Sequence, residues 1–179
     1  MNNIKIYDQF LLPNELKMCC QITSEHVWEY GHSSGQLNTM STPFWYMELI
    51  NNQFLKETIK NKIEKITNKN FKINRLYANG QTYGQNGSFH QDDTNDNSYT
   101  FCLYISPVED NMIDVIGGYI QFKIPEISPF IVELEPLSNR GILFPSNYFH
   151  KGNAFSRYVP NIRICIAWKL EELNISTIY

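Results

Sequence analysis

Short runs rich in β-branched and aromatic residues fill the chain from Phe71 to about residue 170, and residues that favour turns separate them. Such runs are typical of β-strands, and the glycine, proline, asparagine and serine between them are typical of turns. A series of about eight short strands is the pattern of a double-sheet jelly roll, the double-stranded β-helix of cupin-like proteins. The expected strands lie around residues 71–77, 87–91, 98–106, 117–124, 130–134, 141–145, 148–151 and 161–169.

The first part of the chain is predicted to be mainly helical. A short strand at residues 4–7 would precede a helix that begins near Asn14, a favourable cap residue, and runs to about Tyr30. Ser41-Thr42-Pro43 is typical of a helix start with proline at the first helical position, so a second helical segment is expected to follow. Within it, apolar residues recur at helical spacing over residues 54–66, which predicts an amphipathic helix covering a sheet.

We therefore expect a mainly β fold with N-terminal helices. Residues 1–179 would form a single domain, with a helical N-terminal part over about 1–70 and a double-stranded β-helix core over about 71–170, one of its sheets covered by helices. A hydrophobic content of 42% is enough for a core of this size.

Charge and composition argue against nucleic acid and membranes as binding partners of this protein. The chain has 15 basic and 18 acidic residues, a net charge of -3, and no basic stripe, so nucleic acid is not favoured as a partner. It shows no signal-peptide pattern and no apolar run long enough to cross a membrane, and its four cysteines have no paired spacing. These features predict a soluble, cytoplasmic protein with no membrane partner. The oligomeric state is left open.

His90 and Asp92 are the first candidates for a metal site. Side chains two positions apart in a strand project from the same side, so this imidazole and this carboxylate can bind one ion. Of the four histidines, His150 is best placed as a third ligand, because it follows a hydrophobic strand and a Pro-Ser-Asn turn. Two histidines and one carboxylate with open positions are the ligands of non-haem Fe(II) sites. His26 and His32 are expected at the surface or at a helix end.

Arg163 is the candidate anion-binding residue. It opens an apolar strand whose alternation places Arg163, Cys165, Ala167 and Lys169 on one face. A buried arginine needs an anionic partner, and a carboxylate fits its planar fork of donors. An oxygen-activating iron site requires an electron-donating cosubstrate, and 2-oxoglutarate, a dianion, would supply that carboxylate. Tyr104 either completes the carboxylate pocket with its hydroxyl or is a core tyrosine whose hydroxyl is satisfied elsewhere.

The order of these motifs over residues 71–170 resembles the Fe(II)/2-oxoglutarate-dependent oxygenases of the prolyl 4-hydroxylase-like branch. The segments that carry the resemblance are Tyr77-Ala78-Asn79-Gly80, His90-Gln91-Asp92, Leu103-Tyr104-Ile105, Gly117-Gly118-Tyr119-Ile120-Gln121-Phe122, Gly141-Ile142-Leu143-Phe144, His150 and Arg163.

The resemblance implies a function and a role for each site residue. It implies Fe(II) bound by the three candidate ligands, the tail of 2-oxoglutarate bound by Arg163 with help from Tyr104, and Tyr77 lining the cosubstrate pocket. The reaction would be hydroxylation of an unactivated C–H bond, most characteristically in a peptidyl residue such as proline, with succinate and CO2 as coproducts; ascorbate is a possible auxiliary reductant. The sequence departs from the family pattern at Ile120, where the family often has threonine, and in the long gap before Arg163, which leaves Arg157 as a rival.

Other interpretations stay open. Ile73-Asn74-Arg75-Leu76-Tyr77 with the His90-Gln91-Asp92 segment is also similar to the AlkB-type nucleic-acid demethylases, although that branch expects an arginine where Lys169 stands. A non-catalytic jelly-roll binding module would keep the fold but has no need of an open iron site. A zinc hydrolase would need a nearby general base and would have no use for Arg163. The substrate, whether a peptide or a small molecule, is not fixed by these patterns.

Overall fold

The computed structural model describes residues 3–25, 27–34, 42–108, 112, 115–124 and 129–173. Its strands are β1 (Lys5–Tyr7), β2 (Glu29–His32), β3 (Phe44–Glu48), β4 (Phe71–Gln81), β5 (Ser98–Tyr104), β6 (Ile120–Lys123), β7 (Ile131–Leu134), β8 (Arg140–Pro145), β9 (Phe149–Gly152) and β10 (Arg163–Glu172). The helices are α1 (Pro13–Glu25), the π-helical turn η1 (Phe54–Ile59) and α2 (Lys60–Thr67), which continues directly from η1.

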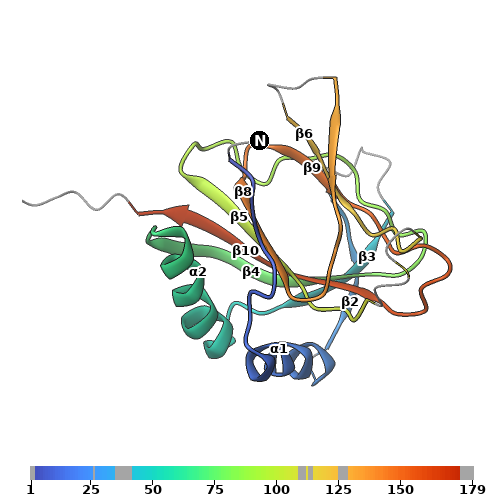
Figure 1. The fold of residues 1–179 in the computed structure, drawn as a ribbon, viewed down its shortest axis with the longest axis horizontal. Helices are drawn as coiled ribbons and strands as arrows, with labels where there is room; N and C mark the ends of the chain where they lie inside the picture. Colours follow the sequence, from blue (N-terminus) through green and yellow to red (C-terminus); the bar gives the residue numbers. More distant parts are fainter. Residues whose placement is uncertain are drawn as a thin grey trace, which may run out of the picture.

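Two antiparallel sheets form the double-stranded β-helix that the strand pattern predicted. The larger has the order β1-β8-β5-β10-β4-β3-β2, and the smaller has the order β7-β6-β9. Figure 1 shows α1 and α2 on the outer side of the large sheet, away from β6 and β9, so the helices cover one sheet as expected. The pairs β10–β4 and β10–β5 place β10 in the middle of the large sheet.

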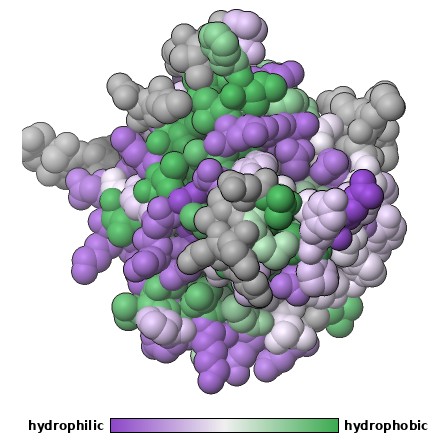
Figure 2. All heavy atoms as spheres, turned by 45° about the vertical axis from the view of Figure 1, so that its right-hand side comes forward, coloured by the Kyte–Doolittle hydropathy of each residue, from purple (hydrophilic) through white to green (hydrophobic). Residues whose placement is uncertain are grey.

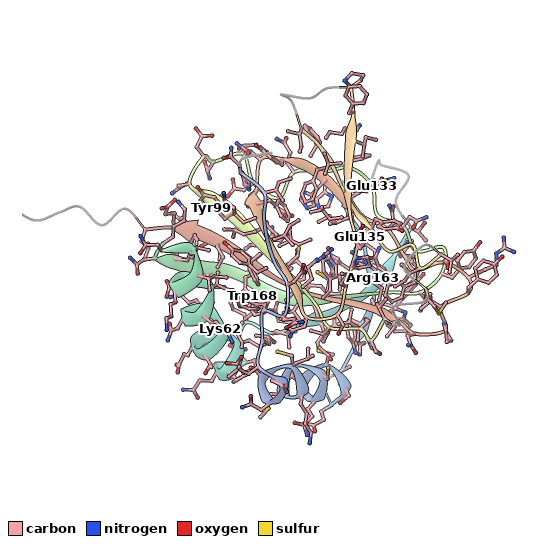
Figure 3. The ribbon with its side chains drawn as sticks, in the orientation of Figure 1. Lys62, Tyr99, Glu133, Glu135, Arg163 and Trp168 are labelled. Atoms are coloured by element: carbon pink, nitrogen blue, oxygen red, sulfur yellow. The ribbon has the colours of Figure 1, made fainter. Side chains whose placement is uncertain are left out.

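Strand β10 separates two cores. Ile166, Trp168 and Leu170 are buried against the helices, whereas Cys165 and Ala167 are buried on the opposite face, between the sheets. The Trp168 ring meets Phe101 edge-on at 5.9 Å between ring centroids, and its indole nitrogen donates to the carbonyl of Leu55 at 3.2 Å. Figure 3 shows Trp168 near the helices and Arg163 between the sheets. The alternation predicted for this strand is therefore confirmed.

Three local expectations are wrong. Helix α1 ends at Glu25, not near Tyr30, and residues 29–32 form β2. Residues 44–48, expected to continue a helix after Pro43, form β3, because the apolar run Phe44-Trp45-Tyr46-Met47 pairs with β4. The run at 87–91 is an irregular segment beside β9, in which His90 exchanges backbone hydrogen bonds with His150 at 2.9 and 3.0 Å. His26 and Ser41 lie outside the described residues.

The surface carries scattered large apolar side chains, among them Val27, Phe130 and Tyr158. Figure 2 shows hydrophobic side chains gathered in a band across the upper part of the face that it brings forward, with mainly hydrophilic side chains beside and below it. Elsewhere on this face apolar residues stand singly, which is ordinary for a folded protein. Across the part of the chain that the structure describes, none of the helices is long and apolar enough to cross a membrane.

Candidate active site between the two sheets

A cavity of about 670 Å³ lies between the sheets. All six residues that the sequence nominated for the site line it: His90, Asp92, His150, Arg163, Tyr104 and Tyr77. They come from both sheets and from the segment that precedes β5. Cavities of this volume accommodate small-molecule ligands.

Three candidate metal ligands converge on one point of the cavity wall. One ligand atom from each of His90, Asp92 and His150 lies within 4.8 Å of the others. The Nε2 atoms of His90 and His150 are 3.5 and 3.3 Å from the two oxygens of Asp92, and the imidazole centroids are 4.4 Å apart. The cluster combines two imidazoles with one carboxylate, the donor set of the non-haem iron facial triad.

The other nitrogen of each imidazole is held by the backbone. Nδ1 of His90 lies 2.9 Å from the carbonyl of Ser88, and Nδ1 of His150 lies 2.9 Å from the carbonyl of Tyr148. A carbonyl only accepts, so each Nδ1 carries a proton and each Nε2 faces Asp92. Burial lowers the pKa of His150 below its usual value, which favours this neutral form. The arrangement fixes the tautomer and ring orientation that a metal ligand requires.

Backbone contacts bring Asp92 to the histidines. The amides of Asp92 and Asp93 both donate to the carbonyl of Ser146, at 2.9 and 3.3 Å. This bend turns the Asp92 side chain into the cavity, where it is 5% exposed. The carboxylate of Asp93 instead accepts from Thr94, Asn95 and Ser98 and caps the following turn.

The outer oxygen of Asp92 is held by two groups. The hydroxyl of Thr100 donates to Oδ2 at 2.6 Å, and the ammonium of Lys169 is in ion-pair contact with the same oxygen. Burial raises the pKa of Asp92, but the charge of Lys169 and the contacts with His150 and His90 together outweigh this effect, so the pKa lies well below its usual value. Asp92 is therefore an anion with one oxygen fixed from behind and the other, Oδ1, turned toward His90.

Arg163 is buried without a counter-charge. Its side chain donates from Nε to the carbonyl of Gly118 and from Nη1 to Oε1 of Gln81, both at 2.7 Å. No carboxylate of the described residues lies within ion-pair distance of it, although only 3% of the residue is exposed. Gly118 has φ +73, and a Cβ there would lie 2.5 Å from the Phe155 ring, so the carbonyl that receives Arg163 depends on glycine. A buried guanidinium with neutral acceptors alone is suited to an anionic ligand.

Tyr104 presents an unused donor beside this arginine. The guanidinium carbon of Arg163 is 4.9 Å from the Tyr104 ring centroid. The Tyr104 hydroxyl is buried, and none of the described residues forms a hydrogen bond with it. Burial raises the pKa of this hydroxyl well above its usual value, so it stays a neutral donor. Arg163 and Tyr104 together fit one end of a dicarboxylate.

The other arginine that the sequence offered, Arg157, lies away from the cavity. Arg157 is exposed, lies against the Tyr158 ring and does not line the cavity. Ile120, which replaces the family's frequent threonine, is buried and lines the cavity without offering a hydrogen bond.

Three residues that support Asp92 or line the cavity were not predicted from the sequence. Lys169 was placed on the correct strand face and Thr100 falls in the strand expected at residues 98–106, but no pattern indicated that they hold Asp92. His32 was expected at the surface; it is partly buried in the cavity wall, with its ring 4.8 Å from that of Tyr46 and 5.9 Å from that of Tyr77. The position of His32 is set by the pairing of β2 with β3, which a local sequence pattern does not reveal.

No protein-family model matches the sequence, and no curated protein matches it either. Solved structures do match. A prolyl hydroxylase from Trichoplax adhaerens, in complex with a peptide of the hypoxia-inducible factor oxygen degradation domain, aligns with a TM-score of 0.71 and 16% identity over 96% of this chain and 84% of that chain.

Two bacterial structures show the same likeness. A 2OG-Fe(II) oxygenase family oxidoreductase from Burkholderia pseudomallei aligns with a TM-score of 0.73 and 10% identity, covering 95% of this chain and 85% of that chain. A prolyl-4-hydroxylase from Pseudomonas putida aligns with a TM-score of 0.67 and 12% identity, covering 96% and 93%. The chain thus has the fold of the prolyl hydroxylases and of other 2OG-Fe(II) oxygenases, as the motif order predicted.

Proposed function

We propose that this protein is an Fe(II)- and 2-oxoglutarate-dependent dioxygenase that hydroxylates an unactivated C–H bond of a peptidyl residue such as proline, with succinate and CO2 as coproducts. One observation carries the proposal: a single cavity contains both a His-Asp-His cluster with its imidazole lone pairs turned inward and a buried arginine that has no carboxylate partner among the described residues.

His90, Asp92 and His150 would hold the iron. Their donor set and the fixed Nδ1 hydrogen bonds suit Fe(II), and three protein ligands leave positions open for other molecules. A bound Fe(II) would supply the redox chemistry by which 2-oxoglutarate and oxygen are consumed and a C–H bond is hydroxylated.

The other cavity residues would bind 2-oxoglutarate and orient the iron ligand Asp92. Arg163 would donate two hydrogen bonds to the distal carboxylate of 2-oxoglutarate, and the free hydroxyl of Tyr104 would donate a third. Ile120 and Ala167 line the same cavity and would exclude water from it. Lys169 and Thr100 would keep Asp92 ionised and oriented.

The alternatives explain fewer of these features. A zinc hydrolase would leave the buried Arg163 and the unsatisfied Tyr104 hydroxyl without a role. A binding module would not require three inward-facing metal ligands. A peptide substrate is supported by the Trichoplax adhaerens structure, which contains a peptide, and by a net charge of -3, which disfavours the AlkB-type alternative.

The test is succinate formation from 2-oxoglutarate by protein loaded with Fe(II) without oxygen, followed on admitting oxygen. Peptides, free amino acids and alkylated oligonucleotides are added as separate pools, and Zn(II)-loaded protein is the control. Stimulation by peptides supports the proposal, whereas stimulation by oligonucleotides alone favours the AlkB-type activity. If iron-holding protein forms no succinate, even without a substrate, the oxygenase assignment is wrong.

A further inference from the structure

The cavity wall formed by β4 and β10 carries two cations directly opposite each other. The register of this strand pair sets Lys169 against Arg75, just as it sets Arg163 against Gln81 at the other end. All four residues line the cavity. Like charges opposite each other on adjacent strands are unfavourable unless anions compensate them.

Only one of these two charges is compensated by the protein. Lys169 is paired with Asp92. Arg75 has no carboxylate of the described residues within ion-pair distance, and the cavity's second acid, Asp93, is engaged by Thr94, Asn95 and Ser98. On the neighbouring strand β3, Glu48 accepts hydrogen bonds from the Tyr46 hydroxyl and from two backbone amides.

Arg75 is exposed at the cavity and lies beside one aromatic ring, which packs against two others. Its guanidinium carbon is 6.0 Å from the centroid of Tyr77, whose ring lies 5.3 Å from Tyr46 and 5.9 Å from His32. Burial lowers the pKa of His32, with the charge of Arg75 as a second cause, so His32 adds no competing positive charge at neutral pH. The result is a cation beside an aromatic wall, with the buried ammonium of Lys169 next to it.

This cationic end is separate from the one assigned to the cosubstrate. Lys169 and Arg163 are six strand positions apart, which separates their Cα atoms by roughly 20 Å at about 3.3 Å per residue. Arg163 lies beside Tyr104, whereas Lys169 and Arg75 lie beside Asp92 and Tyr77. One carboxylate at Arg163 therefore leaves Arg75 without an anion.

We propose that Arg75, supported by Lys169 and by the cavity-lining rings of His32 and Tyr77, binds a carboxylate of the substrate, so that the enzyme selects acidic substrates. The inference rests on the proposed function and specifies its substrate class. The carboxylate belongs either to an acidic peptide residue near the target carbon or to a small carboxylic acid.

The experiment compares matched pools with Fe(II)-loaded protein and 2-oxoglutarate. Capped peptides with one Asp or Glu are paired with the same peptides carrying Asn or Gln, and N-acetyl amino acids are paired with their amides. Substrate-stimulated succinate is expected to be roughly tenfold higher for the acidic member, the range of one charge-assisted hydrogen bond. Whether the peptide or the small-molecule pair shows the preference identifies the source of the carboxylate.

Arg75→Gln should bring the ratio of acidic to neutral stimulation close to one, and Arg75→Lys should retain part of it. Arg157→Gln is the matched control, since this exposed arginine lies away from the cavity, and it should keep the full ratio. Equal stimulation by both members in the unaltered protein overturns the inference. So does an unchanged ratio in Arg75→Gln, or the absence of stimulation by every acid while unstimulated succinate formation is intact. Absence of all succinate instead rejects the proposed function itself.

Discussion

The ammonium of Lys169 contacts Oδ2 of Asp92, so the charge nearest to the candidate metal ligands comes from the last strand of the large sheet. Thr100, itself 3.1 Å from the hydroxyl of Ser146, holds the same oxygen from a second side. The same oxygen also lies 3.3 Å from Nε2 of His150, so Lys169 and Thr100 hold the carboxylate at the cluster. The ion pair between Lys169 and Asp92 is buried. A bound metal ion would add a second positive charge beside Asp92, so the contribution of Lys169 to stability can be measured with and without metal.

Replacing Lys169 by methionine should leave a buried carboxylate without its counter-charge, and the metal-free protein should lose roughly 3–5 kcal/mol of stability. A bound divalent ion returns positive charge, so metal should raise the Tm of Lys169→Met more than that of the unaltered protein. Thermal unfolding with and without metal measures this. Lys60→Met, which removes a partly exposed ion pair with Glu64, is the control and should cost no more than about 1 kcal/mol. Equal metal-induced shifts in Lys169→Met and the unaltered protein would contradict the assigned role.

Asp92 and Asp93 form a matched pair of adjacent acids. Asp92→Asn should lower Fe(II)-dependent succinate formation by more than roughly 100-fold, because it removes the anionic ligand itself, whereas loss of a supporting residue alone costs up to about that much. Asp93→Asn can keep its turn hydrogen bonds and should retain activity. The same loss is expected for His90→Ala. Metal content and succinate are measured together, and normal succinate from Asp92→Asn would refute the ligand assignment.

Arg163 and Tyr104 should affect the cosubstrate in different ways. Arg163→Ala should raise the 2-oxoglutarate concentration required for half-maximal rate by roughly 30-fold or more, since it removes the buried charge that would pair with the carboxylate. Arg157→Ala should leave that requirement unchanged. The measurement is a titration of succinate formation against 2-oxoglutarate for both variants. A larger increase for Arg157→Ala than for Arg163→Ala would show that Arg163 does not bind the cosubstrate.

Tyr104→Phe should separate binding from stability. The buried hydroxyl has no partner among the described residues, so its removal should leave the ligand-free protein equally stable or slightly more stable. Affinity for 2-oxoglutarate should nevertheless fall by roughly tenfold if the hydroxyl donates to the carboxylate. Denaturant unfolding and cosubstrate titration measure the two effects, and an unchanged affinity would assign Tyr104 to the core alone.

His32 should make stability depend on pH. Burial lowers its pKa in the folded protein, so below the unfolded value of about 6.5 the unfolded chain binds the proton more readily and stability falls as the pH decreases. His32→Phe should therefore lose less stability than the unaltered protein between about pH 7.5 and pH 5.5. Denaturant unfolding at several pH values measures this. Parallel curves for the two proteins would show that His32 is not buried in solution.

The parts of the site that the sequence predicted are those governed by local periodicity. Alternation along β10 places Arg163 and Lys169 on one face whatever the partner strands are, and the turn before β9 directs His150 inward. The His90–Asp92 pair was expected from strand geometry, yet the structure reaches the same convergence through a bend that two hydrogen bonds to Ser146 maintain. The expectation of a strand at residues 87–91 was wrong, but the two side chains converge as expected.

Features that depend on distant pairing were not predictable. Residues 44–48 follow a helix-like cap signal, and only their pairing with β4 makes them a strand. The pairing of β2 with β3 places His32 in the cavity wall, with its ring centroid 4.8 Å from that of Tyr46. No short window of sequence contains the information that the rings of His32 and Tyr46 lie beside that of Tyr77.

The alternation of β10 also determines which insertions and deletions the fold can tolerate. Its inward positions carry Arg163 and Lys169, and its outward positions carry Trp168 and the apolar contacts with the helices. Loss or gain of a single residue between Arg163 and Lys169 would exchange the two sets, turning charge into the core and an indole into the cavity. A change in the length of this strand would therefore disturb both the cavity and the core, whereas a change in the length of a connecting loop would leave this alternation intact.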